Sequence, residues 1–158
     1  MRIPPNMTPS TFGEALSKFA SVVGRDWVFT SDEDIALYRD AYSILWDDKE
    51  ERLASAAVAP KTLEEVQEVV RIANKYKVPI YPISTGRNLG YGGSAPAYSG
   101  SVVLDLKRMN RIIDVDERNA SVLVEPGVSY FDLYRHFEEK GVKLLIDCPD
   151  PGWGSLIG

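Results

Sequence analysis

The sequence has a single cysteine and a single histidine among its 158 residues. One cysteine, Cys148, excludes an intramolecular disulfide and is more typical of a reducing compartment. One histidine and one cysteine cannot supply a cluster of zinc-ligating side chains, so we expect no metal site. His136 falls on the polar side of a predicted helix, which favours a solvated histidine over a catalytic one.

Long apolar runs and an excess of basic residues are also lacking. No segment approaches the roughly 20 apolar residues of a membrane span, and residues 1–6 lack the apolar core of a signal peptide. We therefore expect a cytoplasmic protein with no membrane partner. The net charge is −5 with interspersed signs. Because no basic stripe is present to neutralise phosphates, we expect no nucleic-acid partner.

A glycine-rich loop at residues 84–93 is the most informative feature that is present. It reads Ser-Thr-Gly-Arg-Asn-Leu-Gly-Tyr-Gly-Gly and follows an apolar strand predicted at residues 78–81. Glycine adopts positive φ and lets backbone amides approach a ligand, so this loop can surround a diphosphate with N–H groups. The loop predicts nucleotide binding, and an ordinary glycine-rich turn is the alternative.

Two common nucleotide-binding motifs do not fit this loop. A Walker A loop requires Lys and then Ser or Thr after its last glycine, whereas Tyr91 follows Gly90. Residues 90–95 match the Gly-x-Gly-x-x-Ala pattern, but a Rossmann site needs a helix that begins inside the pattern and holds the pyrophosphate. Pro96 and a strand predicted at residues 102–106 follow instead. A Rossmann site is therefore disfavoured.

Periodicity and capping patterns predict an α+β fold. Helices that open with capping patterns are expected over residues 11–23, 31–38, 62–76 and 129–140. Strands are expected at residues 54–58, 78–81, 102–106, 111–115, 121–124 and 142–146. Residues 39–52 mix charges and aromatics without a period and are interpreted as a surface loop.

Residues 54–81 form a β-α-β unit whose two strands we expect to pair in parallel. The glycine loop would then leave the carboxyl end of the second strand, where ligands of open α/β sheets bind.

Four motifs occur in order along the chain. They are Ile-Ala-Asn at residues 72–74, the loop at residues 82–93, Glu-Pro-Gly-Val-Ser-Tyr-Phe-Asp-Leu at residues 125–133, and Asp-Cys-Pro-Asp at residues 147–150 with Gly154-Ser155. Together they resemble the flavin-binding half of the vanillyl-alcohol oxidase and p-cresol methylhydroxylase (PCMH) flavoproteins, in particular the 4-alkylphenol oxidases. The resemblance implies that residues 54–158 form the N-terminal half of a PCMH-type FAD-binding domain, a β-α-β unit plus a mixed sheet flanked by helices. Residues 1–53 would then be an arm that contains a helix.

The resemblance implies FAD as the cofactor. The glycine loop would hold its diphosphate through backbone amides, with hydroxyl donors from Ser84 and Thr85. Arg87 would add positive charge, the alternative being a solvated surface arginine. The implied cofactor-binding residues are Ser84, Thr85, Gly86, Arg87, Asn88, Leu89, Gly90, Gly92, Gly93, Pro126, Pro149, Gly154, Ser155 and Gly158.

The resemblance also implies two catalytic residues. Tyr91 would donate a hydrogen bond to the substrate's phenol oxygen, which stabilises the phenolate and eases hydride transfer from the para carbon to flavin N5, leaving a quinone methide. Asp150 would lie beside N5 and act as a base toward the water that adds to the quinone methide. From the residues alone, Tyr91 has the alternative of an aromatic lid on the loop, and Asp150 that of a turn former before proline.

The implied activity is FAD-dependent oxidation of para-substituted phenols such as vanillyl alcohol or eugenol. In this family, a second tyrosine, an arginine, the flavin-linking residue and a substrate cap come from sequence beyond the point that corresponds to Gly158. We therefore expect a fragment that is inactive alone, binds FAD weakly and needs the rest of the flavoprotein in cis or in trans. Homo-oligomers are a further expectation. The alternative is a stand-alone nucleotide-binding or interaction module without catalysis.

Overall fold

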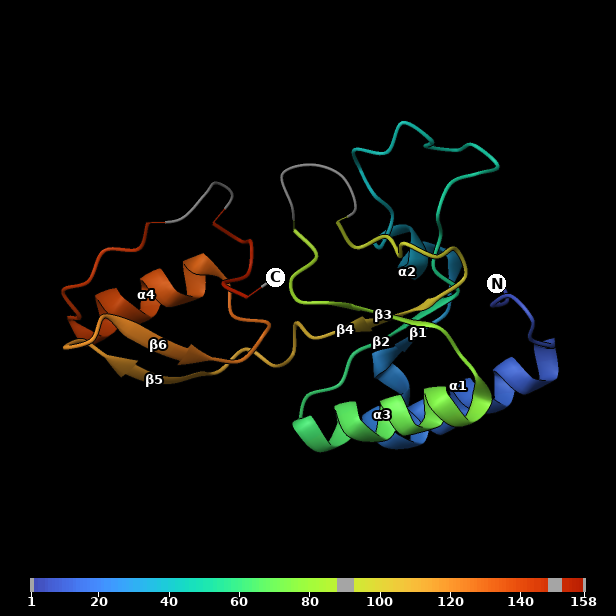
Figure 1. The fold of residues 1–158 in the computed structure, drawn as a ribbon, viewed down its shortest axis with the longest axis horizontal. Helices are drawn as coiled ribbons and strands as arrows, with labels where there is room; N and C mark the ends of the chain where they lie inside the picture. The colour runs from blue at the N-terminus through green and yellow to red at the C-terminus, as the bar shows by residue number, and fades with distance from the viewer. Residues whose placement is uncertain (1, 88–92, 148–151, 158) are drawn as a thin grey trace.

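The computed structural model describes residues 2–87, 93–147 and 152–157, which form two lobes (Figure 1). The sheet lobe, on the right of Figure 1, contains α1 (Pro9–Val23), η1 (Arg25–Trp27), β1 (Val28–Phe29), α2 (Asp32–Ala36), β2 (Ala56–Val58), α3 (Leu63–Tyr76), β3 (Ile80–Ile83) and β4 (Val102–Asp105). The hairpin lobe, on the left, contains β5 (Ile112–Asp116), β6 (Ser121–Val124) and α4 (Tyr130–Lys140). The predicted α+β fold is confirmed.

The sheet lobe is built on a four-stranded sheet with the strand order β1-β2-β4-β3. β4 is parallel to both of its neighbours, with Val102 opposite Ala56 on one side and Ile80 on the other. The expectation that β2 and β3 pair directly is wrong, because β4 lies between them. All four residues of β4 are buried, which suits an apolar strand at the centre of a sheet. β3 contains Pro82, which has no N–H to donate, so this strand takes an edge position.

The N-terminal part of the chain joins the same sheet. β1 pairs antiparallel with β2, with Val28 opposite Val58. α1 and α3 pack together against one face of the sheet, as Figure 1 shows. The core between them includes Phe12, Phe19, Val58, Val69, Val102 and Leu104. On the other face, Tyr38 packs with Ala57 and Val103, so both faces of the sheet are covered.

Helix starts follow the predicted capping patterns in three cases. Ser31, Thr62 and Ser129 each accept a hydrogen bond from the main-chain N–H three residues later. α1 instead begins at Pro9 and is capped by Thr8, whose Oγ1 accepts from the N–H of Thr11 at 3.2 Å. Proline suits the first turn because an N–H there would have no partner within the helix. No helix in the described residues is both long and apolar enough to cross a lipid bilayer.

The hairpin lobe differs from the prediction at its end. β5 and β6 form an antiparallel pair, and α4 buries Leu133 and Phe137. Tyr134 of the same helix is exposed. Residues 142–146 form no strand, and Leu145 is fully exposed. A strand needs a hydrogen-bonding partner, and within the described ranges no strand pairs with this segment.

Tyr38 ties the segment after α2 to the carboxyl end of β4. Its hydroxyl donates to Oδ2 of Asp105 at 2.9 Å, and both residues are buried. Lys107 also contacts Asp105, with its N–H 3.0 Å from Oδ1 and its Nζ 3.2 Å from Oδ2. Burial, together with the negative charge of Asp105, raises the pKa of Tyr38 far above its ordinary value. The phenol therefore remains a hydrogen-bond donor at neutral pH.

We expect Tyr38→Phe to lower the free energy of unfolding by about 1–3 kcal/mol, because a buried carboxylate loses a donor. Urea denaturation of the purified chain measures this change. Tyr134→Phe is the matched control, since Tyr134 is 58% exposed. Equal stability of Tyr38→Phe and the parent would mean that Lys107 alone satisfies Asp105.

Candidate functional site

Two cavities meet where the glycine loop leaves and rejoins the sheet lobe. The smaller, called the cradle here, has a volume of about 170 Å³ and is lined by residues 81–87, Gly93 and Ser155. The larger, called the aromatic cavity, has a volume of about 650 Å³ and is lined chiefly by residues between 36 and 46, by Lys107 and by Trp153. Gly86, Arg87 and Gly93 line both cavities. The loop therefore begins at the carboxyl end of β3, as predicted.

The cradle holds a hydroxyl group that lacks a partner. Thr85 is 8% exposed, and its Oγ1 is buried with no hydrogen-bond partner in the part of the chain that the structure describes. A buried hydroxyl without a partner costs about 1–3 kcal/mol, so such a group points to a ligand or ordered water at that place. None of the described residues that line the cradle is a carboxylate, and Arg87 is among them. These features suit an anionic group.

Ser84, the neighbour of Thr85, has a different contact. Its Oγ lies 2.5 Å from Oγ of Ser155, so this hydrogen bond joins the two lobes. Ser155 also forms a β-bridge with Ser129, the residue that caps α4. The two adjacent hydroxyls therefore differ in their contacts: Ser84 contacts the other lobe, and Thr85 has no hydrogen-bond partner among the described residues.

The N-terminus of α4 does not supply a second anion site. The N–H of Tyr130 donates to the carbonyl of Gly154 at 3.1 Å, and the N–H of Phe131 donates to the carbonyl of Gly152 at 2.8 Å. The N–H of Asp132 donates to Oγ of Ser129 at 3.1 Å. A helix N-terminus binds an anion through N–H groups that have no other partner. The cradle is therefore the better place for phosphate.

Gly86 shapes the base of the loop. Its φ is +65°, and a Cβ at this position would overlap Oγ of Ser94 and lie 3.1 Å from Cδ1 of Ile83. Oγ of Ser94 donates to the carbonyl of Gly86 at 3.2 Å, which closes the loop across its two ends. Both the conformation and the lack of space require glycine here.

The aromatic cavity combines aromatic rings with positive charges. Its rings are those of Tyr42, Trp46 and Trp153, its cations are Arg39, Arg87 and Lys107, and its one carboxylate among the described lining residues is Asp40. Except for Arg87, these residues were not among the predicted site residues. Residues 39–52 have no helix or strand, in agreement with the predicted loop, but part of this segment is a wall of the cavity. The signal that could have identified these residues is the presence of aromatic side chains in a segment without helix or strand periodicity. The composition suits an anionic ligand with aromatic rings.

Arg39 organises that wall. Its Nε and Nη2 donate to the two carboxylate oxygens of Glu51 at 2.7 and 2.6 Å, and Nη2 also donates to Oδ1 of Asp47 at 2.7 Å. Glu51 is 4% exposed and accepts a further hydrogen bond from the N–H of Asp47 at 2.9 Å. The paired Arg39 guanidinium holds the pKa of Glu51 below its ordinary value. These contacts close residues 39–51 into a defined loop.

Acidification is therefore expected to destabilise the chain partly through Glu51. Glutamate in the unfolded chain titrates near 4.5, and the folded value is lower, so the unfolded state takes up the proton first as the pH falls. The stabilisation that ionised Glu51 provides is complete above the pKa of the unfolded state. It is lost as the pH falls through the lower pKa of the folded state. Urea denaturation between pH 7 and pH 3 should show a shallower acid loss for Glu51→Gln than for the parent. Glu50→Gln, at an exposed position, is the control; parallel profiles for parent and Glu51→Gln would contradict the assignment.

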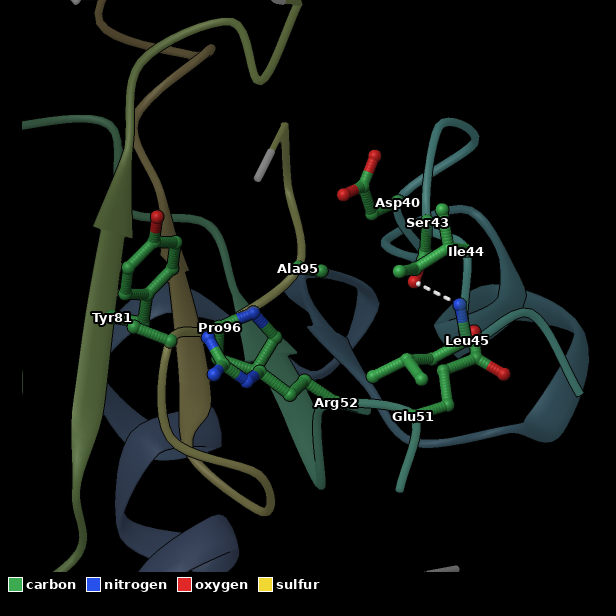
Figure 2. A pocket seen from close by; sticks show the side chains of 10 residues that line it. Asp40, Ser43, Ile44, Leu45, Glu51, Arg52, Tyr81, Ala95 and Pro96 are labelled. Carbon is green, nitrogen blue, oxygen red and sulfur yellow. Dashed lines mark hydrogen bonds between the residues drawn. The ribbon is translucent and has the colours of Figure 1, made fainter. Parts of the chain in front are cut away.

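A third cavity, of about 450 Å³, is lined by Asp40, residues 43–45, Glu51, Arg52, Tyr81 and residues 95–97 (Figure 2). Figure 2 shows Tyr81 and Pro96 on one side and Ile44 and Leu45 on the other, with the N–H of Leu45 donating to Oγ of Ser43 at 3.1 Å. Its lining is mainly apolar, and none of the described side chains around it is a buried hydroxyl without a partner. This cavity does not match a diphosphate.

The structure brings together part of the predicted site. Ser84, Thr85, Gly86, Arg87, Gly93 and Ser155 surround the cradle. Gly154 is next to it, whereas Pro126 is half-buried in the turn after β6 and lines neither the cradle nor the aromatic cavity. The remaining predicted residues lie outside the described ranges: Asn88, Leu89, Gly90, Tyr91, Gly92, Pro149, Asp150 and Gly158. No cluster of three or more potential metal ligands occurs in residues 2–87, 93–147 and 152–157.

Known proteins are similar to this chain in sequence and fold. Residues 54–158 match the model of the FAD binding domain family. The 4-cresol dehydrogenase (hydroxylating) flavoprotein subunit of Pseudomonas putida is 38% identical over 149 residues, which are 94% of this chain and 28% of that protein. The structure of 4-ethylphenol oxidase from Gulosibacter chungangensis in its isoeugenol complex matches with a TM-score of 0.93 and 40% identity, over 99% of this chain and 30% of that one. Substrate-bound p-cresol methylhydroxylase matches with a TM-score of 0.89 and 37% identity, over 96% of this chain and 29% of that one. The chain thus spans less than a third of these relatives' length.

Proposed function

Because this chain belongs to the FAD binding domain family, in the form found in p-cresol methylhydroxylase, we propose that it is the cofactor-holding part of a flavoprotein that oxidises para-substituted phenols. Its cofactor is FAD. Support for the phenol comes from the relatives named for 4-cresol and 4-ethylphenol. One observation in the chain itself carries the proposal. The buried hydroxyl of Thr85 has no hydrogen-bond partner among the described residues, and it lies in a cradle suited to an anion.

The FAD diphosphate is proposed to bind in the cradle. The hydroxyl of Thr85 would donate to a phosphate oxygen, as would the main-chain amides of the loop from Gly86 to Gly93. Arg87 and Lys107 would supply positive charge from the adjoining aromatic cavity. Ser84 would keep the two lobes together through Ser155 rather than contact phosphate.

Bound FAD supplies a two-electron acceptor. Tyr91 is proposed to donate a hydrogen bond to the phenol oxygen, which favours the phenolate and so makes loss of hydride from the para carbon easier. The substrate is thereby converted to a quinone methide. Asp150 is proposed to take a proton from the water that adds to this product. Both roles derive from the family resemblance. The remaining length of the relatives is proposed to complete the substrate site, in cis or in trans.

Titration of the purified chain with FAD tests this function. We expect saturable binding at one FAD per chain, weak in affinity, measured by flavin fluorescence and visible circular dichroism. The chain alone should not oxidise vanillyl alcohol, whereas a full-length flavoprotein that contains it should. Failure to bind FAD would contradict the proposal. Phenol oxidation by the chain alone would contradict the expected need for further sequence. FAD binding without phenol oxidation in the full-length protein would favour a nucleotide-binding module.

A further inference from the structure

Trp46 is a large aromatic side chain in a place where packing does not explain it. It belongs to the segment between α2 and β2, is 48% exposed and lines the aromatic cavity beside Gly86 and Gly93. It is not part of either group of buried core residues. A half-exposed indole in the wall of a cavity is available to a ligand.

Arg39 holds this indole in place. The guanidinium carbon lies 3.6 Å from the centroid of the Trp46 ring. The guanidinium is itself held by Glu51 and Asp47, at 2.6 to 2.7 Å. One face of the indole is therefore covered by a fixed cation, and Trp46 also lines the cavity. Because the ring is ordered before a ligand arrives, stacking on it would lose little side-chain entropy.

We propose that Trp46, positioned by Arg39, is a stacking platform for a planar aromatic ring of bound FAD. This inference rests on the proposed function, because it takes the aromatic cavity to be continuous with the phosphate-binding cradle at Gly86, Arg87 and Gly93. FAD carries two planar ring systems, the isoalloxazine and the adenine. Either one can stack on an indole, so the platform is defined by this shared chemistry.

The chain contains a matched control for this pair. Trp27 carries the guanidinium of Arg108 at 3.8 Å from its ring centroid and is 39% exposed, much like Trp46. Trp27 lies in η1 and does not line the aromatic cavity. A general effect of removing an arginine-stacked tryptophan should appear when either Trp27 or Trp46 is substituted. A loss of FAD affinity should appear only when Trp46 is substituted.

FAD titration of the chain tests the platform. Trp46→Leu is expected to raise the Kd for FAD about tenfold, the size typical of losing one ring stack. Trp46→Phe should recover most of this affinity, and Trp27→Leu should bind as the parent does. Titrations with FMN and with ADP then separate the two rings, because the loss should appear with the fragment whose ring stacks. Far-UV circular dichroism verifies that each variant is folded.

Arg39 is tested as a positioning residue through Trp46. Arg39→Lys keeps the charge but not the two-pronged contact with Glu51, so it should raise the Kd for FAD several-fold in the parent. In the Trp46→Leu background it should have no further effect on Kd. A purely structural role would weaken binding in both backgrounds, which would overturn the positioning role.

Either of two results would contradict the proposal that Trp46 is a stacking platform, and only the second would also contradict the proposed function. Unchanged FAD, FMN and ADP affinities in Trp46→Leu, with weakened FAD binding in Thr85→Val, would remove the platform and leave the proposed function intact. No FAD binding by the parent chain would remove the proposed function and the platform with it.

Discussion

Thr85→Val is expected to weaken FAD binding by about 10- to 100-fold, since a hydrogen bond to a charged group is worth about 1.5–3 kcal/mol. The same substitution should leave the FAD-free chain at least as stable as the parent. Valine has nearly the shape of threonine and lacks only the hydroxyl, which in the described structure is buried without a partner. Removing such a group relieves an unfavourable burial and removes no hydrogen bond among the described residues.

Thr85→Val is informative because it should weaken FAD binding without lowering the stability of the FAD-free chain. FAD affinity is measured by flavin fluorescence, and the free energy of unfolding by urea denaturation without FAD. Thr85→Ser keeps a hydroxyl and should bind FAD within a few-fold of the parent. Ser84→Ala should show the reverse pattern, with lower stability from the lost contact to Ser155 and a smaller change in affinity. Unchanged affinity in Thr85→Val would show that this hydroxyl does not contact the cofactor.

Tyr91→Phe, made in a full-length flavoprotein that contains this chain, is expected to lower kcat by about 10²- to 10³-fold. A phenolate gives up hydride more readily than a phenol, and the lost donor is proposed to stabilise that anion. FAD should remain bound, because the substitution leaves the main-chain amides of the loop and the Thr85 hydroxyl in place. Stopped-flow reduction of the flavin by substrate measures the step directly.

Tyr98→Phe is the control for this substitution, since Tyr98 follows the same loop and is 58% exposed. It should reduce the flavin at the parental rate. A parental rate in Tyr91→Phe would end the catalytic role of Tyr91. Loss of FAD in that variant would point instead to the alternative role, an aromatic ring that packs on the loop.

The order of the strands and the residues that form the wall of the aromatic cavity could not be predicted from the sequence. The apolar run of β4 and Pro82 in β3 are visible in the sequence, and both bear on which strand is central. The rule that successive strands of a β-α-β unit pair nonetheless led to the wrong neighbours. Segment 39–52 has no period by which its folded position could be predicted. Its place beside the glycine loop depends on Tyr38, whose partner Asp105 is 67 residues away.

By itself, the sequence determined the features that depend on residues close together in the chain. These include three of the helix caps, the glycine at position 86 and the loop after β3, because capping and backbone conformation are set within a few residues. Only the tertiary structure distinguished the hydroxyls of Ser84 and Thr85, which are adjacent and chemically alike. Ser155, 71 residues further along, binds the first, and among the described residues nothing binds the second. Contacts between such distant residues exist only once the lobes have packed, so no local pattern encodes them.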